Sequence, residues 1–365
     1  MKIAIYSPYL DTAGGGEKYI LTIAEYLSGE EEVDILLDDH LWKIGAGEIK
    51  RKIEKLHGID LAKANFVKSP IGKGGGFLER LLFLRRYDFL FYLTDGSIFF
   101  STAKNSVVHF QVPFTKLPGL EVWTKLKLSS WKEAIYNSKF TKSYVEKNWG
   151  IKGKVIYPPV SVNLFRSLRK KKQILSVGRF FGFLKDEQSS SSSKKHEFLV
   201  KAFKEFIAEH GLHDWSLHLA GGATKGDEKY LDHLKNISAG YKIFLYPNVD
   251  IEKLKKLYGE SMIYWHASGF GEDDPKKFEH FGITCVEAMA AGAIPIVINK
   301  GGLTEIVEDG KSGYLWDSTD QLKDQTLEVI KNGRLRKKMV EEGQRKALDF
   351  SKETFIAKIN ELVYG

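Results

Sequence analysis

Two successive series of strand-like and helix-like segments make up the chain, and this alternation constrains the fold more than any other feature. Short apolar runs, typical of buried strands, are separated by longer segments whose apolar residues recur at helical spacing. The pattern breaks at Tyr157-Pro158-Pro159 and begins again with a new apolar run at Ile174–Val177. Alternating strands and helices predict βαβ units with mostly parallel sheets. We therefore expect two α/β domains of similar size.

The segments are assigned as follows. In the first half the predicted strands are Lys2–Tyr6, Val33–Leu37, Phe89–Leu93, Val107–Phe110, Glu133–Tyr136 and Val155–Tyr157. In the second half they are Ile174–Val177, Ser216–Leu219, Ile243–Leu245, Met262–Trp265 and Ile294–Ile298. We place the domains at residues 1–165 and 166–350, with the basic stretch Arg166–Lys172 as a solvated connector. The serine run Ser189–Ser193 is of low complexity and cannot build a core.

Charge and cysteine content limit the partners and the compartment. The formal net charge of +8 is compatible with anionic substrates, an acidic membrane surface or nucleic acid. A basic nucleic-acid-binding protein is disfavoured because the aromatic residues follow core periodicity and no nucleic-acid motif is present. The single cysteine, Cys285, gives no sign of an oxidising compartment. MKIAIYSPYL has too short an apolar run for a signal peptide, and no run is long enough to span a membrane. We expect a cytoplasmic protein.

A glycine-rich turn follows the first predicted strand and opens the first predicted helix. It reads AGGGE, with Gly14, Gly15 and Gly16 before Glu17. Glycines let a ligand approach the backbone, and a helix N-terminus offers unpaired N–H groups to an anion such as phosphate. A tight turn without a ligand would need the same residues, so the motif alone leaves both interpretations open. The dinucleotide fingerprint does not fit, because Tyr19 stands where its third glycine belongs.

The stretch EHFGITCVEAMAAG, residues 279 to 292, places two carboxylates around a second helix start. Glu279 precedes the helix, Gly282 allows close backbone approach, and Glu287 lies one turn inside. Carboxylates bind the hydroxyls of ribose and hexose, whereas helix-start amides bind phosphate. A nucleotide sugar contains all three groups. The alternative is that Glu279 caps the helix and Glu287 pairs with a surface lysine.

Two basic residues lie early in the same half. Arg179 directly follows the strand Ile174–Gly178, and Lys194 precedes the next predicted helix. Strand ends in an open α/β sheet converge on one crevice, so both side chains are placed to neutralise a diphosphate. The alternative is that each is a solvated surface cation without a ligand, which is the commoner situation for arginine and lysine.

Together these motifs resemble retaining glycosyltransferase family 4, of GT-B fold. The resemblance covers almost the whole chain, and its most specific part is the block from Glu279 to Glu287 with AMAAGAIPIVINKGGLTEIVEDGKSGYL after it. AGGGEKYIL, VVHFQVPF, NSKFT and VIYPP are similar to α-1,2-mannosyltransferases that extend lipid-linked oligosaccharide from GDP-mannose. The loop SGFGEDDPKKF is longer than the family pattern. The resemblance implies two Rossmann-like domains facing a central cleft, the first for the acceptor and the second for the nucleotide sugar. It also implies that a final helix, residues 351–365, crosses back to the first domain.

The resemblance also implies a role for each matching residue. Glu279 would hold the transferred sugar and support the charge near its anomeric carbon, and Glu287 would hold the ribose. Arg179 and Lys194 would stabilise the departing diphosphate in place of a metal ion, so no metal and no cofactor is expected. Further donor contacts would come from Gly15, Gly16, Val249, His266, Phe281, Gly282, Ile283 and Thr284. His109 would lie near the reacting carbon, although a lone histidine is more often structural. A role in core packing suits His266 equally well.

The reaction implied is transfer of a mannose- or glucose-type hexose from a GDP- or UDP-linked donor to a glycan or lipid-linked acceptor. A GT-B nucleotide-sugar epimerase is the alternative within enzymes. Apolar and basic residues mix in GFLERLLFLRRYDFLF and in WTKLKLSSWKEAIYNSKF. Such a mixture suits docking of the enzyme at the inner face of an anionic membrane, and it suits core packing under a basic surface equally well.

Overall fold

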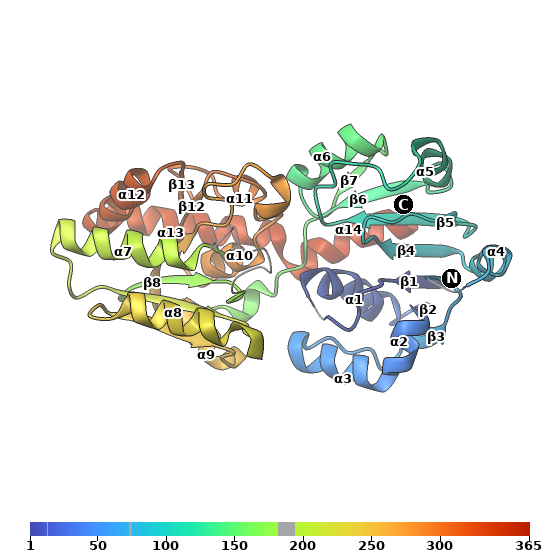
Figure 1. The fold of residues 1–365 in the computed structure, drawn as a ribbon, viewed down its shortest axis with the longest axis horizontal. Helices are drawn as coiled ribbons and strands as arrows, with labels where there is room; N and C mark the ends of the chain where they lie inside the picture. The colour runs from blue at the N-terminus through green and yellow to red at the C-terminus, as the bar shows by residue number, and fades with distance from the viewer. Residues whose placement is uncertain (13, 73–74, 182–193) are drawn as a thin grey trace. The chain divides into compact units, whose positions relative to one another are not determined.

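The structure is a computed structural model that describes residues 1–12, 14–72, 75–181 and 194–365. These residues divide into two units (Figure 1). Unit 1 consists of residues 1–159 and 353–365, and unit 2 of residues 160–352. The serine run Ser189–Ser193 lies outside the described residues.

Unit 1 is built on a parallel sheet whose described strands are in the order β3-β2-β1-β4-β5-β6-β7. The strands are β1 (Lys2–Tyr6), β2 (Glu32–Leu37), β3 (Asn65–Lys68), β4 (Phe89–Leu93), β5 (Asn105–Phe110), β6 (Glu133–Tyr136) and β7 (Gly153–Val155). The helices are α1 (Gly15–Leu27), α2 (Asp39–Ile44), α3 (Ala46–His57), α4 (Phe77–Leu84), α5 (Glu121–Leu128), α6 (Lys139–Trp149) and α14 (Lys352–Tyr364). Both neighbours of β1 are parallel to it, with Ile3 beside Val33 on one side and Phe89 on the other.

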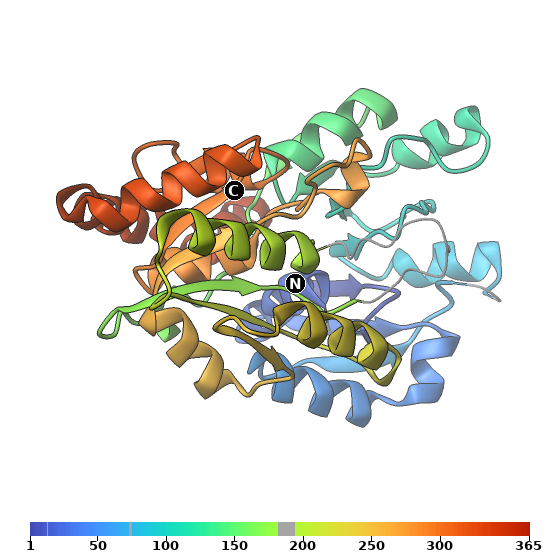
Figure 2. The same ribbon diagram turned by 60° about the vertical axis from the view of Figure 1, so that its left-hand side comes forward.

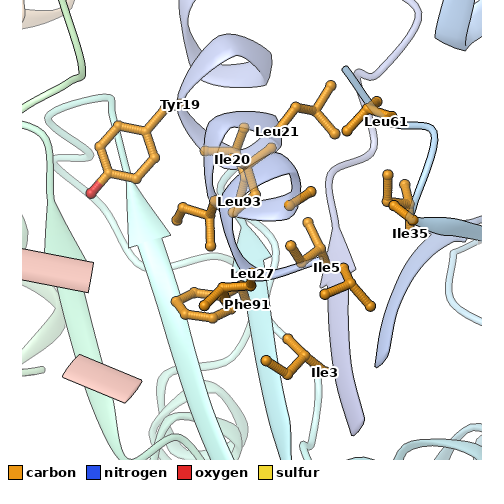
Figure 3. Packing of buried hydrophobic residues seen from close by; sticks show 14 of the residues in the cluster. Ile3, Ile5, Tyr19, Ile20, Leu21, Leu27, Ile35, Leu61, Phe91 and Leu93 are labelled. Atoms are coloured by element: carbon orange, nitrogen blue, oxygen red, sulfur yellow. The ribbon is translucent and has the colours of Figure 1, made fainter. Parts of the chain in front are cut away.

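Alternate residues of each strand in unit 1 enter opposite cores, as a sheet covered on both faces requires. Ile3 and Ile5 of β1 pack with α1 and α3, and Figure 3 shows Ile20 and Leu27 of α1 in the same cluster. The intervening residues of β1 and β4 face a second core with α4, α5 and α6. The central strands β1 and β4 are continuous apolar runs because both of their faces are buried.

The last helix belongs to unit 1 although the chain reaches it from unit 2. Phe355 and Ile359 of α14 are buried in the core that also holds α1. The Phe355 ring meets the Tyr19 ring edge-on at 4.8 Å between centroids. At the helix end, Tyr364 donates a hydrogen bond to Glu31 over 3.1 Å. Residues 353–365 therefore complete the first core.

Unit 2 has a parallel sheet in the order β10-β9-β8-β11-β12-β13 among the described strands. These strands are β8 (Lys171–Val177), β9 (Ser216–Gly221), β10 (Ile243–Pro247), β11 (Ser261–His266), β12 (Ile294–Ile298) and β13 (Tyr314–Trp316). The helices are α7 (His196–His210), α8 (Glu228–Ser238), α9 (Ile251–Glu260), α10 (Ile283–Ala290), α11 (Leu303–Ile306), α12 (Thr319–Lys331) and α13 (Gly333–Ala347). Short 3-10 helices cover Val162–Leu164, Lys225–Asp227, Pro275–Lys277 and Leu348–Phe350. Helix α7 packs beside α8 and α12, whereas α10 packs beside α9 and α13.

Three boundaries differ from those expected. The last two residues of the expected connector Arg166–Lys172 belong to β8, which begins at Lys171. The stretch is solvent-exposed as expected, except for Lys170, which is half-buried and donates from Nζ to the carbonyl of Ala291 over 2.6 Å. That burial lowers the pKa of Lys170 to about 7. The strand expected at Val155–Tyr157 ends at Val155, next to the two prolines. The units meet between residues 159 and 160, since Val160 pairs with Ser351 inside unit 2.

Candidate active site

The candidate site of unit 2 forms where β8 and β11 end side by side. The chain moves from β8 outward through β9 to β10, then returns to place β11 on the other side of β8. At such a reversal the loops after the two strands diverge to opposite faces and leave a crevice in which ligands bind. Arg179 follows β8, and His266 is the last residue of β11.

A carboxylate, an ammonium and an imidazole meet at this point. One oxygen of Glu279, Oε2, lies 2.6 Å from Lys194 Nζ and 3.1 Å from His266 Nε2. The other oxygen, Oε1, has no hydrogen bond recorded within the described residues, and the side chain is 19% exposed. Glu279 is therefore held in place by one oxygen while the second can accept a hydrogen bond from a ligand.

The protonation of this trio follows from its surroundings. Burial alone would raise the pKa of Glu279, but the Lys194 ammonium and the His266 hydrogen bond outweigh it and hold the pKa well below 4.5. Burial lowers the pKa of His266 and outweighs the opposing effect of Glu279. His266 Nδ1 accepts the backbone N–H of Ser268 over 3.3 Å. A neutral His266 thus donates its Nε2 proton to an ionised Glu279.

Two glycines after β12 fix the backbone of the Glu279 loop. The Gly302 N–H donates to the carbonyl of Glu279 over 2.8 Å. A Cβ on Gly301 would lie 2.2 Å from that carbonyl oxygen, and one on Gly302 would lie 2.4 Å from the carbonyl oxygen of His280. Larger residues would push the loop away, so this glycine pair positions Glu279. The pair lies within the stretch that resembles the family, but the sequence alone indicated no role for it.

The start of α10 adds backbone donors beside the carboxylate. Gly282 precedes the helix with φ at 117°, a conformation that favours glycine. The N–H groups of Ile283 and Thr284, in the first turn, have no carbonyl within the helix to bond. The Phe281 ring is buried and packs 5.4 Å from the Phe350 ring. The loop thus presents polar backbone while its aromatic side chain anchors it.

Glu287 lies one turn into α10 and is half-buried. The Tyr258 hydroxyl, from α9, donates to Glu287 Oε2 over 2.8 Å. Thr284 is similarly tied, with 2.7 Å between its hydroxyl and that of Tyr264. Both tyrosines are buried, which raises their pKa values far above the ordinary one. Sequence reasoning missed them, because a tyrosine in an apolar strand or helix gives no sign that it orients a site residue.

The basic residues of the site divide between a fixed and an exposed position. Lys195 is buried in an ion pair with Glu272, 2.5 Å away, and its backbone is left-handed with φ at 56°. That anchor turns the preceding Lys194 toward Glu279, and so Lys194 rather than Lys195 reaches the carboxylate. Arg179 is exposed, and its guanidinium carbon lies 5.4 Å from the centre of the Phe181 ring. No ion pair is recorded for Arg179 among the residues described.

The loops after β9 and β10 meet next to Val249, which the family resemblance implies as a donor contact. The Asn248 side chain exchanges two hydrogen bonds of 2.9 Å with the backbone of Ala223. Asn248 is left-handed, with φ at 55°. The neighbouring Val249 is half-buried. This clasp fixes the backbone next to Val249, where side-chain identity carries little information.

The glycine-rich turn and His109 belong to unit 1. The Gly14 N–H donates to Glu17 Oε2 over 2.9 Å, and Glu17 is buried. Helix α1 starts at Gly15, and a Cβ on Gly16 would lie 2.2 Å from the Gln111 side chain. Glu17 and Gln111 thus shape the turn, and neither was predicted as a site residue.

His109, at the carboxyl end of β5, is only 1% exposed. Its ring stacks on the Tyr19 ring with 4.0 Å between centroids. Burial lowers the pKa of His109 to about 3, so its imidazole is neutral. In the described structure the His109 side chain packs in the core of unit 1. Its role near the reacting carbon stays a prediction.

The residues thus fall into two groups. Unit 2 brings together Lys194, His266, Glu279 and the start of α10, with Glu287 one turn further on. Gly15, Gly16 and His109 lie in unit 1. The unit 2 group combines cationic, anionic and backbone N–H groups, which is the chemistry needed to hold a phosphate beside a sugar hydroxyl.

The chain resembles known proteins in sequence and in structure. Residues 165–346 match the family "Glycosyl transferases group 1". A 203-residue part, 50% of the chain, is 29% identical to GDP-Man:Man(3)GlcNAc(2)-PP-Dol alpha-1,2-mannosyltransferase of Xenopus laevis, covering 38% of that enzyme. The chain thus spans well under two thirds of this curated relative.

Solved structures share the fold over the full chain. A glycosyltransferase of Rickettsia africae has a TM-score of 0.72 and 18% identity over 99% of this chain and 97% of its own. Anabaena HepE, solved with UDP and glucose, has a TM-score of 0.68 and 17% identity over 100% of this chain and 99% of its own. These likenesses confirm the predicted GT-B fold with its two Rossmann-like units.

Proposed function

Residues 165–346 belong to the glycosyl transferases group 1 family, and from this premise we propose that the protein is a retaining hexosyltransferase. It moves a mannose- or glucose-type sugar from a GDP- or UDP-linked donor to a glycan or lipid-linked acceptor. The relative in Xenopus laevis is named for GDP-mannose, and Anabaena HepE was solved with UDP and glucose. Both donor types therefore enter the proposal.

The contact of Glu279 with Lys194 and His266 carries the proposal. The leaving diphosphate gains charge as its bond to the sugar breaks, and Lys194, Arg179 and the α10 amides supply the stabilising positive field. The free oxygen of Glu279 holds a sugar hydroxyl beside the anomeric carbon. The acceptor oxygen bonds to that carbon on the face that the diphosphate leaves, and a diphosphate oxygen takes the acceptor proton. Attack on that face retains the anomeric configuration.

We propose that this reaction needs no metal ion. In metal-dependent transferases a cation neutralises the diphosphate, and here the basic side chains take that place. Among the described residues, no group of three or more histidine, cysteine or acidic side chains has the geometry to hold a metal. Turnover that persists in excess EDTA is the expected result. Loss of activity that manganese or magnesium restores would contradict this part of the proposal.

The defining experiment is a donor screen followed by product analysis. The chain is incubated with GDP-mannose, UDP-glucose and related donors, with and without glycan acceptors. Release of nucleoside diphosphate together with an α-linked product by NMR is the expected result. Conversion of the donor into its epimer without an acceptor would favour the epimerase alternative instead. For the variant Glu279→Gln, the matched control is Glu341→Gln on the exposed side of α13, which also removes one carboxylate charge but lies away from the site.

A membrane surface is the partner that we propose for unit 1. The apolar side chains exposed by α4, α5 and the residue before α5 are Phe77, Leu78, Leu82, Leu120, Val122, Trp123 and Leu126. Leu78 and Val122 are more than 70% exposed. Arg85, Arg86, Lys125 and Lys127 accompany them, and we call this set the α4–α5 surface. Both helices lie at the same end of unit 1 in both views (Figures 1 and 2). No helix in the described ranges has the length and apolar character to cross a bilayer.

Apolar side chains that insert between lipids, next to cations that attract anionic headgroups, are the two requirements for interfacial docking. Vesicles containing phosphatidylserine or phosphatidylglycerol should therefore sediment the protein, and phosphatidylcholine vesicles should not. Replacing Leu82 and Trp123 with serine should abolish binding. The exposed Leu348 of unit 2 serves as the control for loss of one apolar side chain. Equal binding to both vesicle types would refute docking driven by charge.

A further inference from the structure

A cavity of about 440 Å³ opens in unit 1, and residues after β1, β2 and β4 line it. Strand order reverses between β1 and β4, as it does between β8 and β11 in unit 2. Ligands of open α/β sheets bind at this reversal. We propose that the cavity binds an uncharged pyranose, the sugar end of the acceptor, with Asp38 and Asp95 accepting its hydroxyl protons. The proposal rests on the transferase function above and assigns it an acceptor class.

Aromatic rings form one wall of the cavity. Tyr6 and Tyr92 stack with 5.5 Å between centroids, and Phe99 lies 4.8 Å from Tyr92. All three rings are largely buried and present only part of their surface. Sugar sites combine such apolar surface, which packs on ring C–H groups, with a few oriented polar groups. A cavity of this volume accommodates one or two sugar rings.

The polar groups are two carboxylates whose positions are fixed by the protein. Asp95 Oδ1 accepts the N–H of Ser97 over 2.9 Å, and its Oδ2 has no hydrogen bond recorded within the described residues. Asp38 Oδ1 caps α2 through the N–H of Leu41, and its Oδ2 accepts the Tyr6 hydroxyl over 3.2 Å. Carboxylate oxygens accept more than one hydrogen bond each. Each aspartate can therefore take a sugar hydroxyl without moving.

Arg80 supplies the donors that the cavity otherwise lacks. Its guanidinium carbon lies 5.6 Å from the centre of the Phe99 ring and 5.9 Å from that of Phe77. Among the described residues it has no recorded hydrogen bond or ion pair, and its Nε is buried. A ligand oxygen could satisfy this nitrogen and its neighbours.

The charge of the cavity decides between sugar classes. Among the described residues, the lining has the carboxylates of Asp38, Asp39 and Asp95 against the Arg80 guanidinium and the His40 imidazole. Asp39 also lies 3.1 Å from Lys68 Nζ. Carboxylates thus outnumber the cations, and the field opposes an anionic ligand. A phosphorylated sugar or a uronic acid should bind less well than the neutral sugar of the same ring shape.

Two isoleucines in the cavity wall allow glycoside binding to be detected by NMR. Ile71 and Ile98 line the cavity, whereas Ile283 starts α10 in unit 2. The protein with labelled isoleucine δ1 methyl groups is titrated with methyl α-D-mannopyranoside and methyl α-D-glucopyranoside. Saturable shifts at Ile71 and Ile98 are the expected result. No shift with either glycoside, or binding of methyl α-D-glucuronide at least as tight, overturns the proposal.

The variant Asp95→Asn separates ligand contact from folding. It leaves Oδ1 and its bond to Ser97 in place and replaces only the second oxygen with a donor. Glycoside binding should weaken about tenfold, because a hydrogen bond to a charged group is lost. The exposed Asp60→Asn in the same unit should bind as wild type does. Unchanged binding by Asp95→Asn would remove Asp95 from the site and refute its assignment.

Donor binding is measured on the same samples. GDP and UDP should shift Ile283 and leave Ile98 unchanged. If neither nucleotide binds while the glycoside still shifts Ile98, the transferase proposal fails and the sugar cavity remains. If a nucleotide shifts Ile283 but no glycoside shifts Ile98, the cavity assignment alone fails.

Discussion

Units 1 and 2 repeat one topology but equip its binding position differently. In each sheet the first strand of the unit is flanked by the second and fourth, so both have a crevice at the same place. In unit 2 that place holds an ionised Glu279 paired with Lys194 and His266. In unit 1 it holds aromatic rings with Asp38 and Asp95. We propose that one layout serves a diphosphate in one unit and a neutral sugar in the other, because the loops rather than the strands carry the chemistry.

The largest contrast should come from two phenylalanines on either side of the unit boundary. Phe350 is buried in unit 2 and Phe355 in unit 1. Replacing a buried phenylalanine with alanine costs about 3–5 kcal/mol of the free energy of unfolding. Phe355→Ala should destabilise unit 1 and Phe350→Ala unit 2. Denaturant unfolding followed by methyl signals of Ile5 and Ile263 separates the two effects.

If both variants lowered the stability of both units equally, the units would unfold as one cooperative body. The inference that units 1 and 2 unfold independently of each other would then be wrong.

A second contrast concerns the two glutamates of unit 2. Glu279→Gln keeps the shape of the side chain but removes the charge that Lys194 and His266 hold. We expect turnover to fall about 10²–10³-fold, as for other groups that act on developing charge, while the dissociation constant of the donor changes little. Single-turnover rates and calorimetric donor titration measure the two quantities. A loss confined to donor affinity would contradict a role in the transition state.

As the pH is lowered, unit 2 should unfold before unit 1. Burial lowers the pKa of His196 to about 3 and of His218 to about 4 in unit 2, whereas in unit 1 the pKa of His109 is lowered to about 3. Each unfolded histidine binds a proton below about pH 6.5 that its folded form refuses, so stability falls as pH decreases from there. At pH 5 each contributes a loss of about 2 kcal/mol.

Native methyl signals followed from pH 7 to pH 5 in mild denaturant test this order. Ile263 of unit 2 should lose its native signal before Ile5 of unit 1. His218→Gln, which removes one proton-binding site of unfolded unit 2, should narrow the interval between them. The reverse order would show that carboxylates, not histidines, set the acid limit.

The smallest expected effect is that of Glu287→Ala. This change removes the acceptor that Tyr258 orients, and we expect nucleotide affinity to fall about tenfold with the single-turnover rate little changed. Tyr258→Phe, which keeps Glu287 but removes its hydrogen bond, should weaken binding less. Donor titration by calorimetry gives both constants. Equal loss of affinity in Glu279→Gln and Glu287→Ala would remove the distinction between the two carboxylates.

The strands were the most predictable part of the fold. The expected bounds of Lys2–Tyr6, Phe89–Leu93 and Ile294–Ile298 agree with the structure, because buried parallel strands are continuous apolar runs. Asn65–Lys68 was missed because it is short and half polar, and Tyr314–Trp316 because it is only three residues long. Lysines misled the assignment at Lys171, since a strand may extend into solvent at its amino end.

Site residues were predictable where a short motif surrounds them. Glu279, Gly282 and Glu287 share one stretch of sequence, and that stretch places them around the start of α10. The aromatic cavity of unit 1 was not foreseen, because Tyr6, Arg80 and Tyr92 come from three distant segments. Only the sheet order brings them together, and a single sequence does not reveal it.

The return of α14 to unit 1 sets an order on folding during synthesis. Unit 2 is one continuous stretch, residues 160–352, so every contact of its core is available once that stretch leaves the ribosome. Unit 1 begins the chain but needs Phe355 and Ile359 to fill the core beside α1. Domains usually complete themselves in the order of synthesis. Of these two units, the one translated earlier is therefore expected to be completed later, because its core lacks Phe355 and Ile359 until residues 353–365 have been synthesised.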